Sequence, residues 1–264
     1  MSSLPEIDFC GTRISRLIIG GNPISGTSHQ NADLDAQMED YYTSERIKHT
    51  LRRCAEEGIN TAQLRGDKHI ARILREYRLE GGRINWIGQT APEMSPYENS
   101  VRFIKNNGAF CMYHHGTVTD ELFKAGEYAE IQRLLNVIRQ TGLPVGLGSH
   151  MPEVLEYACT HHWDVDFFMC CVYNISKAAP GQPEPFDAGD PDIMYSFIRS
   201  TDKPCLAFKI LGAGRNCASH DSVRAAFAHA FESIKPSDAV VVGMFPRDSD
   251  QVAENAAIVR EVAR

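Results

Sequence analysis

The chain alternates short apolar runs with longer stretches of helical spacing, and this alternation repeats eight times. The runs are rich in isoleucine, valine, phenylalanine and cysteine, and most lack the polar–apolar alternation of a half-exposed strand. Such runs are typical of parallel strands that are buried on both faces. We expect strands at residues 17–19, 61–64, 84–89, 111–114, 144–148, 167–173, 204–211 and 239–243.

Apolar side chains at helical spacing occupy the stretches between these runs. Ile47, Leu51 and Cys54 form one such stripe, and Gly58 ends it as glycine commonly ends a helix. Further helices are expected at residues 131–138, from Pro152 onward, and at 192–199, 222–234 and 250–263. Strands that alternate with helices imply a parallel sheet. Eight such units in 264 residues, close to the roughly 250 typical of the fold, predict one (β/α)₈ TIM barrel domain over residues 1–264.

Three segments fall outside the repeat. Residues 5–15 are predicted to form an N-terminal β-hairpin around Gly11, which would close the bottom of the barrel. Residues 22–43 and 176–189 are long and polar, and each follows a predicted strand. Loops of this length in a compact domain usually cover an active site or are partly disordered. We therefore expect both at the catalytic end of the barrel.

Composition excludes several classes of protein. The net charge is −7, whereas a protein that binds nucleic acid usually carries a basic surface. No apolar run approaches the roughly 20 residues that a membrane span needs, and residues 1–8 do not form an export signal. We expect a cytoplasmic monomer or small homo-oligomer that binds a small-molecule substrate, and neither nucleic acid nor a membrane.

The cysteines and tryptophans have simple interpretations. The eight cysteines are scattered with no C-x-x-C pair, which is typical of buried free thiols in a reducing compartment. Trp86 and Trp163 are taken as exposed hydrophobic positions that leave room for a dimer contact. The stretch after Trp163 is more simply the approach to a buried strand.

Three histidines stand at the ends of two neighbouring predicted strands. His114 and His115 end one strand, and His150 follows the next. Enzymes of this fold carry their chemistry where the strands end. Successive strand residues point to opposite sides, so only one of His114 and His115 faces the centre, and we expect it to be His115. An imidazole titrates near neutral pH, so all three are candidate catalytic acid–base groups.

A divalent metal is an alternative role for the same residues. His115, His150 and Glu153 are the candidate ligands for zinc or manganese. Their spacing matches no compact metal motif.

Other polar residues end or follow the remaining strands and are candidate substrate contacts. Arg65 among them is suited to a bidentate contact with a carboxylate. The candidates are Asn22, Gln63, Arg65, Asp67, Gln89 and Tyr173. A ring of this kind indicates an enzyme more firmly than it indicates one reaction.

Several segments that lie mostly at strand ends, taken together, carry a resemblance to a known family. They are ISRLIIGGNPISG, EEGINTAQLRGD, VGLGSHMPEVLEYA, FMCCVYN, AFKILGAG and VVVGMFPRDSDQVAENAAIV. These segments span most of the chain and resemble the aldo-keto reductase superfamily. The resemblance implies a barrel that binds NADP, with the Phe208 ring stacked on the nicotinamide. The cofactor contacts that it implies are Ser149, Phe208, Lys209, Gly243, Arg247, Gln251, Glu254 and Asn255.

The chain departs from that family at the catalytic positions. The family's reductases use an aspartate, a tyrosine, a lysine and a histidine. Here Gln63 stands at the aspartate position, Gln89 stands at the lysine position, and no tyrosine follows. Only the histidine remains, as His114 or His115. A glutamine does not lower the pKa of a phenol as a lysine does, and no phenol is there to act as the acid.

Two functions of different classes follow from these observations. The first is acid–base chemistry of the isomerase, epimerase or lyase type on a small polar, sugar-derived carbonyl or hydroxy compound, with or without a metal. The second is an NAD(P)-dependent oxidoreductase with an altered site that uses His115 as its acid. A third is a barrel that binds a nucleotide or other ligand without turnover. We favour the first because three of the four catalytic positions are changed.

Overall fold

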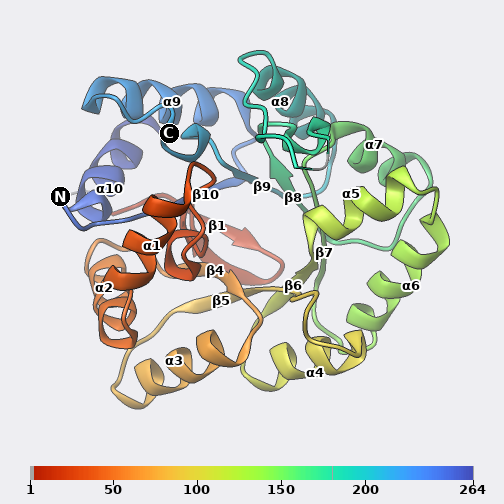
Figure 1. Ribbon diagram of the computed structural model, residues 1–264, viewed down its shortest axis with the longest axis horizontal. Coiled ribbons are helices and arrows are strands. Elements are labelled where there is room, and N and C mark those ends of the chain that lie inside the picture. The colour runs from red at the N-terminus through yellow and green to blue at the C-terminus, as the bar shows by residue number, and fades with distance from the viewer. Residues whose placement is uncertain (1–2, 180, 264) are drawn as a thin grey trace.

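The computed structural model describes residues 3–179 and 181–263, and its centre is a closed barrel of eight parallel strands (Figure 1). The strands pair in the order β10-β3-β4-β5-β6-β7-β8-β9. Their bounds are β3 Leu17–Gly20, β4 Thr61–Arg65, β5 Asn85–Gln89, β6 Cys111–His114, β7 Val145–Ser149, β8 Phe167–Cys171, β9 Cys205–Phe208 and β10 Ala239–Gly243. The predicted TIM barrel is confirmed. The seventh barrel strand, β9, ends earlier than expected because Lys209 adopts a left-handed backbone conformation with a φ of 63°.

Helices surround the barrel, and most of them cover the outer face of its strands (Figure 1). They are α1 Ala32–Tyr41, α2 Ser44–Glu56, α3 Lys68–Leu79, α4 Tyr97–Asn106, α5 Gly116–Lys124, α6 Tyr128–Arg139, α7 Pro152–Thr160, α8 Asp190–Ser200, α9 His220–Ser233 and α10 Gln251–Val262. Three short 3₁₀ turns span Pro23–Ser25, Ile175–Lys177 and Gly212–Gly214. No helix in the described ranges is both long and apolar enough to cross a membrane.

Helix α1 lies inside the segment 22–43 that we expected as a polar loop. The Asn31 side chain caps it by accepting a hydrogen bond from the Leu34 N–H at 2.9 Å. Met38 is the one residue of this helix that is fully buried. The helix therefore has no apolar stripe by which the sequence could reveal it.

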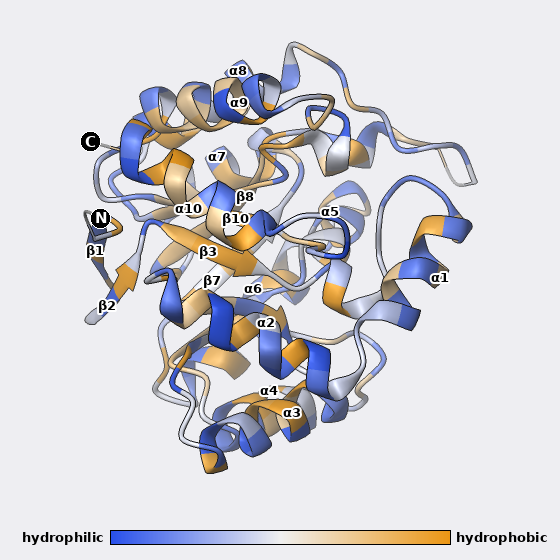
Figure 2. Ribbon diagram, turned by 90° about the vertical axis from the view of Figure 1, so that its left-hand side faces the viewer, coloured by the Kyte–Doolittle hydropathy of each residue, from blue (hydrophilic) through white to orange (hydrophobic). Residues whose placement is uncertain are grey.

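The N-terminal hairpin closes one end of the barrel, as predicted. Strand β1 (Glu6–Phe9) pairs antiparallel with β2 (Thr12–Ser15), and Gly11 makes the turn with a φ of 79°. Phe9 is fully buried, and its ring centroid lies 5.0 Å from that of Phe167 on β8. Figure 2 shows the hairpin and α1 at opposite ends of the molecule. The hairpin thus leaves the C-terminal ends of the strands open for a site.

Buried apolar side chains form an inner and an outer layer. Ile18 belongs to the cluster inside the barrel, while its neighbours Leu17 and Ile19 belong to the cluster between strands and helices. Trp86 and Trp163 lie in the outer layer and are 0% and 4% exposed, so the idea that they are free for a dimer contact is wrong. All eight cysteines are free, as expected, and most are buried.

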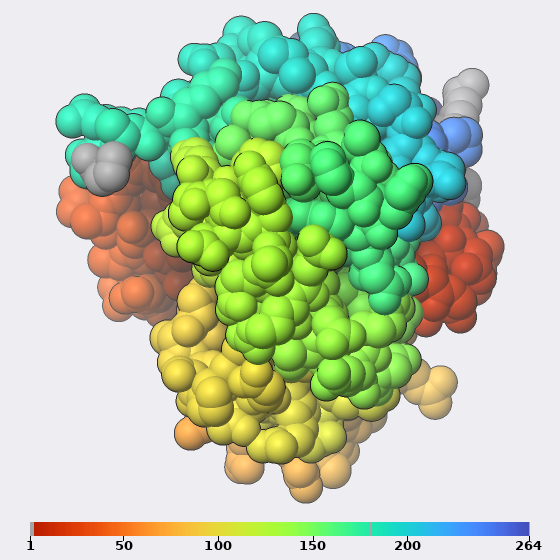
Figure 3. Space-filling view, turned by 90° about the vertical axis from the view of Figure 1, so that its right-hand side faces the viewer, coloured from red at the N-terminus to blue at the C-terminus, as the bar shows by residue number. Residues whose placement is uncertain are grey.

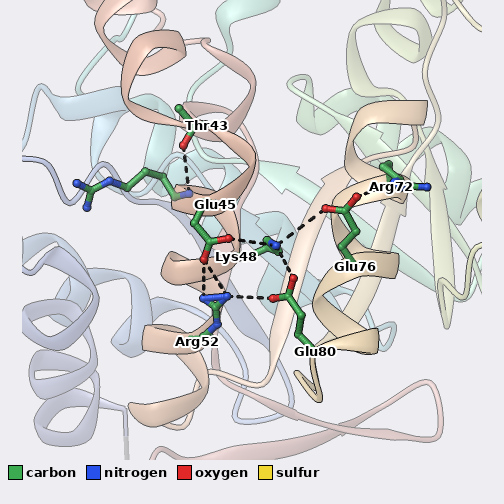
Figure 4. Close-up of polar contacts among 8 residues, drawn as sticks. Thr43, Glu45, Lys48, Arg52, Arg72, Glu76 and Glu80 are labelled. Carbon is green, nitrogen blue, oxygen red and sulfur yellow. Dashed lines mark hydrogen bonds and ion pairs between the residues drawn. The ribbon is translucent and has the colours of Figure 1, made fainter.

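An ion-pair network joins α2 to α3 on the outside of the barrel (Figure 4). Lys48 Nζ lies 3.1 Å from a Glu45 oxygen and 4.0 Å from a Glu76 oxygen, and it also pairs with Glu80. Arg52 bridges Glu45 and Glu80 at 3.0 Å each. Because the side chains come from two helices, the network fixes how these helices pack side by side.

Candidate active site

A cavity of about 760 Å³ opens at the C-terminal ends of the barrel strands. Its size lies within the range of small-molecule sites. Most of the predicted site residues line it: Asn22, Gln63, Arg65, Gln89, His115, His150, Phe208, Lys209, Gly243, Gln251, Glu254 and Asn255. The barrel therefore brings together residues that are spread over most of the sequence.

The remaining predicted residues do not line this cavity. Asp67 caps the N-terminus of α3, and Tyr173 is buried in the core. Arg247 pairs at the surface with the neighbouring aspartate. Ser149 and His114 are buried behind the cavity wall. These five residues, and Glu153 at a separate small cavity, thus lie away from the main cavity.

His114 and His115 point to opposite sides, as the alternation along a strand requires. His114 is buried, and its Nδ1 lies 3.0 Å from the Tyr97 hydroxyl on α4. Burial lowers the pKa of His114 to about 3. His115 lines the cavity, and burial, together with the nearby charges of Arg65 and His150, lowers its pKa to about 4. His115 is therefore neutral at pH 7.

Asp120 on α5 is buried against His150 and holds its ring. One Asp120 oxygen lies 2.8 Å from His150 Nδ1 and accepts the His150 backbone N–H at 3.2 Å. The same carboxylate accepts the hydroxyls of Ser149 and Ser176, each at 2.5 Å. This arrangement assigns the proton of the ring to Nδ1. His150 Nε2 makes no hydrogen bond to any described residue and is accessible from the cavity.

Asp120 and Ser176 were not among the site residues expected from the sequence. Asp120 lies on α5, a short helix that begins two residues after the end of β6. A residue in the second turn of such a helix is still close to the C-terminal ends of the strands. That position was readable from the sequence. Its pairing with His150 was not, because it depends on β6 and β7 being neighbours in the closed barrel.

Arg65 lies at the cavity with a carboxylate of the chain already bound. Its Nε lies 3.1 Å from Glu93 Oε1, and its NH2 group pairs with the other Glu93 oxygen. The pair lowers the pKa of the Glu93 carboxyl. The Arg65 guanidinium thus makes a bidentate contact with the Glu93 carboxylate.

Two loops that are far apart in the sequence meet beside the cavity. His29 Nδ1 lies 2.8 Å from a Glu184 oxygen, and both residues line the cavity. The Arg215 guanidinium lies 3.6 Å from the centroid of the Phe186 ring and donates to the His29 carbonyl at 3.1 Å. Figure 3 shows the teal residues of the loop at 176–189 against the orange residues near α1. Both long loops therefore lie at the end of the barrel where we expected them.

The cavity continues along β9 and β10 to the start of α10. Gln251 in this arm accepts the Phe245 N–H at 2.8 Å, and Glu254 accepts the Ser249 hydroxyl at 3.1 Å. Asn255 is buried at the wall. The resemblance to aldo-keto reductases implies cofactor contacts at these positions, and all three residues line the cavity.

The suggested metal site is not formed. Within residues 3–179 and 181–263, no group of three or more His, Cys, Asp or Glu side chains is arranged to hold a metal ion. Glu153 lines a separate cavity of about 230 Å³, which His150 shares, while His115 faces only the main one. Asp120 already occupies His150 Nδ1. The three proposed ligands thus do not converge.

Comparisons with known proteins identify the fold. No protein-family model matches the chain, and no curated protein matches it in sequence. A truncated form of 3-deoxy-D-arabino-heptulosonate 7-phosphate synthase from Thermotoga maritima is similar in structure, with a TM-score of 0.59 and 13% identity over 98% of this chain and 91% of that one.

Two further solved structures are similar over nearly all of their length. An aldo-keto reductase from Bacillus halodurans, in its holo form, has a TM-score of 0.60 and 11% identity over 100% of this chain and 97% of that one. Dihydropteroate synthase from Yersinia pestis has a TM-score of 0.53 and 12% identity over 97% and 96%. These are enzymes with different activities, and at such identities the likeness shows the fold alone. Membership of the aldo-keto reductase superfamily stays a prediction.

Proposed function

We propose that the protein is an acid–base enzyme of the isomerase, epimerase or lyase type that acts on a small polar, sugar-derived carbonyl or hydroxy compound. The observation that carries the proposal is the buried Asp120–His150 pair at the open end of the barrel. An aspartate on Nδ1 orients an imidazole and stabilises the imidazolium that forms when Nε2 takes a proton. A barrel whose strand ends carry such a pair is suited to proton transfer at carbon.

His150, one of the three histidines that the sequence made candidate acid–base groups, is the proton acceptor in this proposal. The substrate lies in the cavity with an acidic C–H bond facing His150 Nε2. His150 takes the proton as the carbonyl oxygen gains negative charge, and then returns it to a neighbouring atom. His115, neutral at pH 7 because its pKa is lowered to about 4, supplies a hydrogen bond to that oxygen rather than a charge. Arg65, Gln63 and Gln89 hold the hydroxyl or carboxylate groups of the substrate.

Exchange of substrate hydrogen with solvent tests this proposal. Dihydroxyacetone, glyceraldehyde and their phosphates would be incubated with the protein in D₂O, and loss of the proton signal at the carbon next to the carbonyl would be followed by NMR. We expect enzyme-dependent exchange with at least one compound and a loss of about 100-fold or more in His150→Gln. His161→Gln is the matched control because His161 lies on the surface, stacked on Tyr157. Equal exchange in the wild-type protein and His150→Gln would refute the assignment.

A second function is favoured by one observation, the arm of the cavity along β9 and β10. Gln251, Glu254 and Asn255 line it, and Phe208 lines the cavity at the end of β9. The arm fits NADP, which would supply hydride chemistry when bound. Titration with NADPH, followed by its fluorescence, distinguishes the two functions. Tight binding together with NADPH-dependent reduction of an aldehyde would favour the oxidoreductase over proton transfer.

A further inference from the structure

Lys209 is a cavity residue to which the proposed acid–base reaction has given no role. It follows β9 directly, and its carbonyl accepts the Gly212 N–H at 2.7 Å in a tight turn. Its φ of 63° is in the left-handed region, which favours glycine over a residue with a side chain. A lysine kept in such a backbone position at a cavity is a candidate for a functional residue.

The Lys209 amine is without a partner in the described parts of the chain. No hydrogen bond or ion pair joins its Nζ to residues 3–179 or 181–263, yet Nζ is not sealed from the cavity. Glu184 lies within electrostatic reach but forms its ion pair with His29. Arg65, which also lines the cavity, is bound to Glu93. The Lys209 amine is therefore available to react with a ligand in the cavity.

The electrostatic surroundings favour the neutral amine. Burial lowers the pKa of Lys209, and the nearby charge of Arg215 lowers it further. Cys171 and Glu184 act in the opposite direction, but the effect of burial is the largest. A lysine with a lowered pKa is unprotonated in a larger fraction of molecules near neutral pH than an ordinary surface lysine is. Only the unprotonated amine attacks a carbonyl carbon.

We propose that Lys209 forms an iminium with the carbonyl carbon of the substrate, which makes the substrate an aldehyde or a ketone. This inference rests on the proposed acid–base function and deepens it. His150 and Lys209 line the same cavity, so one ligand can contact both groups. The Phe208 ring, next to Lys209, lies 5.8 Å from the His150 ring, centroid to centroid.

The chemistry needs no oxidant or further reactant. The lone pair of Nζ forms a C–N bond to the carbonyl carbon, and a proton moves from nitrogen to oxygen to give a carbinolamine. The hydroxyl then takes a proton and leaves as water, so that a cationic C=N bond remains. This cation withdraws electrons from the adjacent C–H bond, and His150 takes the proton. His150 then returns the proton to a carbon of the resulting enamine, which restores an iminium. Addition of water to this iminium releases the product and the free amine, and it gives back to solvent the proton that the hydroxyl took.

Reductive trapping tests the inference on the whole protein. Dihydroxyacetone and glyceraldehyde would each be incubated with the protein and sodium borohydride, and the product mapped by peptide mass spectrometry. Reduction of the iminium adds the mass of the probe less one oxygen atom. We expect the adduct on Lys209 at least tenfold above any other lysine. Its absence, or equal labelling of many lysines, overturns the inference.

A variant of Lys209 and a matched control distinguish the nucleophilic amine of Lys209 from its positive charge. Lys209→Arg keeps the positive charge but lacks the amine, so we expect it to lose the adduct while it stays folded. Lys177→Arg is the matched control, because Lys177 is paired with Asp190 at 2.5 Å and is expected to leave labelling of Lys209 unchanged. Acetylacetone, a 1,3-diketone that captures unprotonated lysines, gives a readout independent of substrate identity. A reaction with Lys209 whose pH midpoint is no lower than that of ordinary lysines would contradict the proposal.

The outcomes for Lys209 and for His150 are distinguishable. Exchange of substrate hydrogen without any trapped adduct refutes the iminium and leaves the acid–base function standing. An adduct on Lys209 without exchange supports the iminium and refutes the role of His150. Loss of both in the wild-type protein refutes both.

Discussion

Replacement of Asp120 by asparagine removes a charge and keeps nearly the same shape. The best orientation of the amide points its oxygen at His150 and Ser176, where it accepts the same hydrogen bonds. Its NH₂ group then points at the Ser149 hydroxyl, which accepts from it and still donates to the Met151 carbonyl, now 3.1 Å away. Each group that donates to Asp120 in the wild-type protein therefore keeps a hydrogen-bond partner in Asp120→Asn.

The expected magnitudes follow from these contacts. A hydrogen bond to a charged group contributes about 1.5–3 kcal/mol and a neutral one about 1 kcal/mol, so three weakened bonds cost about 2 kcal/mol of stability once the relieved burial of a charge is included. The loss in catalysis should be larger. The imidazolium at His150 loses the carboxylate 2.8 Å from its Nδ1, and we expect exchange to slow by at least about 100-fold, or about 2.7 kcal/mol.

The assay pairs hydrogen exchange by NMR with urea unfolding on the same samples. Ser176→Ala is the control, because it removes one hydrogen bond to Asp120 and keeps the charge. We expect it to slow exchange by less than about tenfold. Asp120→Asn protein that is folded and exchanges as fast as the wild type would refute the reasoning.

Three other predictions concern stability. Unfolded histidines titrate at 6.5, whereas folded His114 and His115 titrate at about 3 and about 4, so below pH 6.5 the unfolded state takes up more protons. Stability should fall from pH 6.5 toward pH 4, by up to about 2.7 kcal/mol per pH unit in urea titrations, and a flat profile would contradict the burial argument. Gly146→Ala places a Cβ 2.4 Å from the ring of Phe167 and should cost about 1–3 kcal/mol in chemical denaturation, while Gly189→Ala, which meets no atom within 4 Å, should stay within about 0.5 kcal/mol. Lys48→Met should lower the melting temperature, by an amount that shrinks as salt rises; no dependence on salt would show that the network in Figure 4 does not act through charge.

The fold was readable from the sequence because its signals are local. Each barrel strand is a run of apolar residues, and each run differs from the helical stripes on either side. Helix α1 was not predicted because Met38 is its only buried residue, so its sequence has no apolar stripe at helical spacing. The strand end at Phe208 was misplaced for a similar reason, since the left-handed conformation of Lys209 has no signature in a lysine.

The site was readable only in part. Placement of side chains at strand ends follows from the fold, and alternation along β6 separated His115 from His114. The choice between His115 and His150 as the proton acceptor depends on Asp120, which reaches the neighbouring strand from α5. The Glu93 carboxylate on Arg65 and the Glu184 carboxylate on His29 are likewise contacts between elements. No pattern within one segment reports such pairs.

The most direct test of the account is hydrogen exchange by protein that has been stripped of nucleotide. Denaturation, washing and refolding, or passage over charcoal, would remove any NADP, and the absorbance spectrum would confirm it. The account predicts deuterium from D₂O at the carbon next to the substrate carbonyl, at an unchanged rate, with His150→Gln inactive. Incorporation that requires added NADP, or transfer of deuterium from labelled NADPH to the carbonyl carbon, would contradict it.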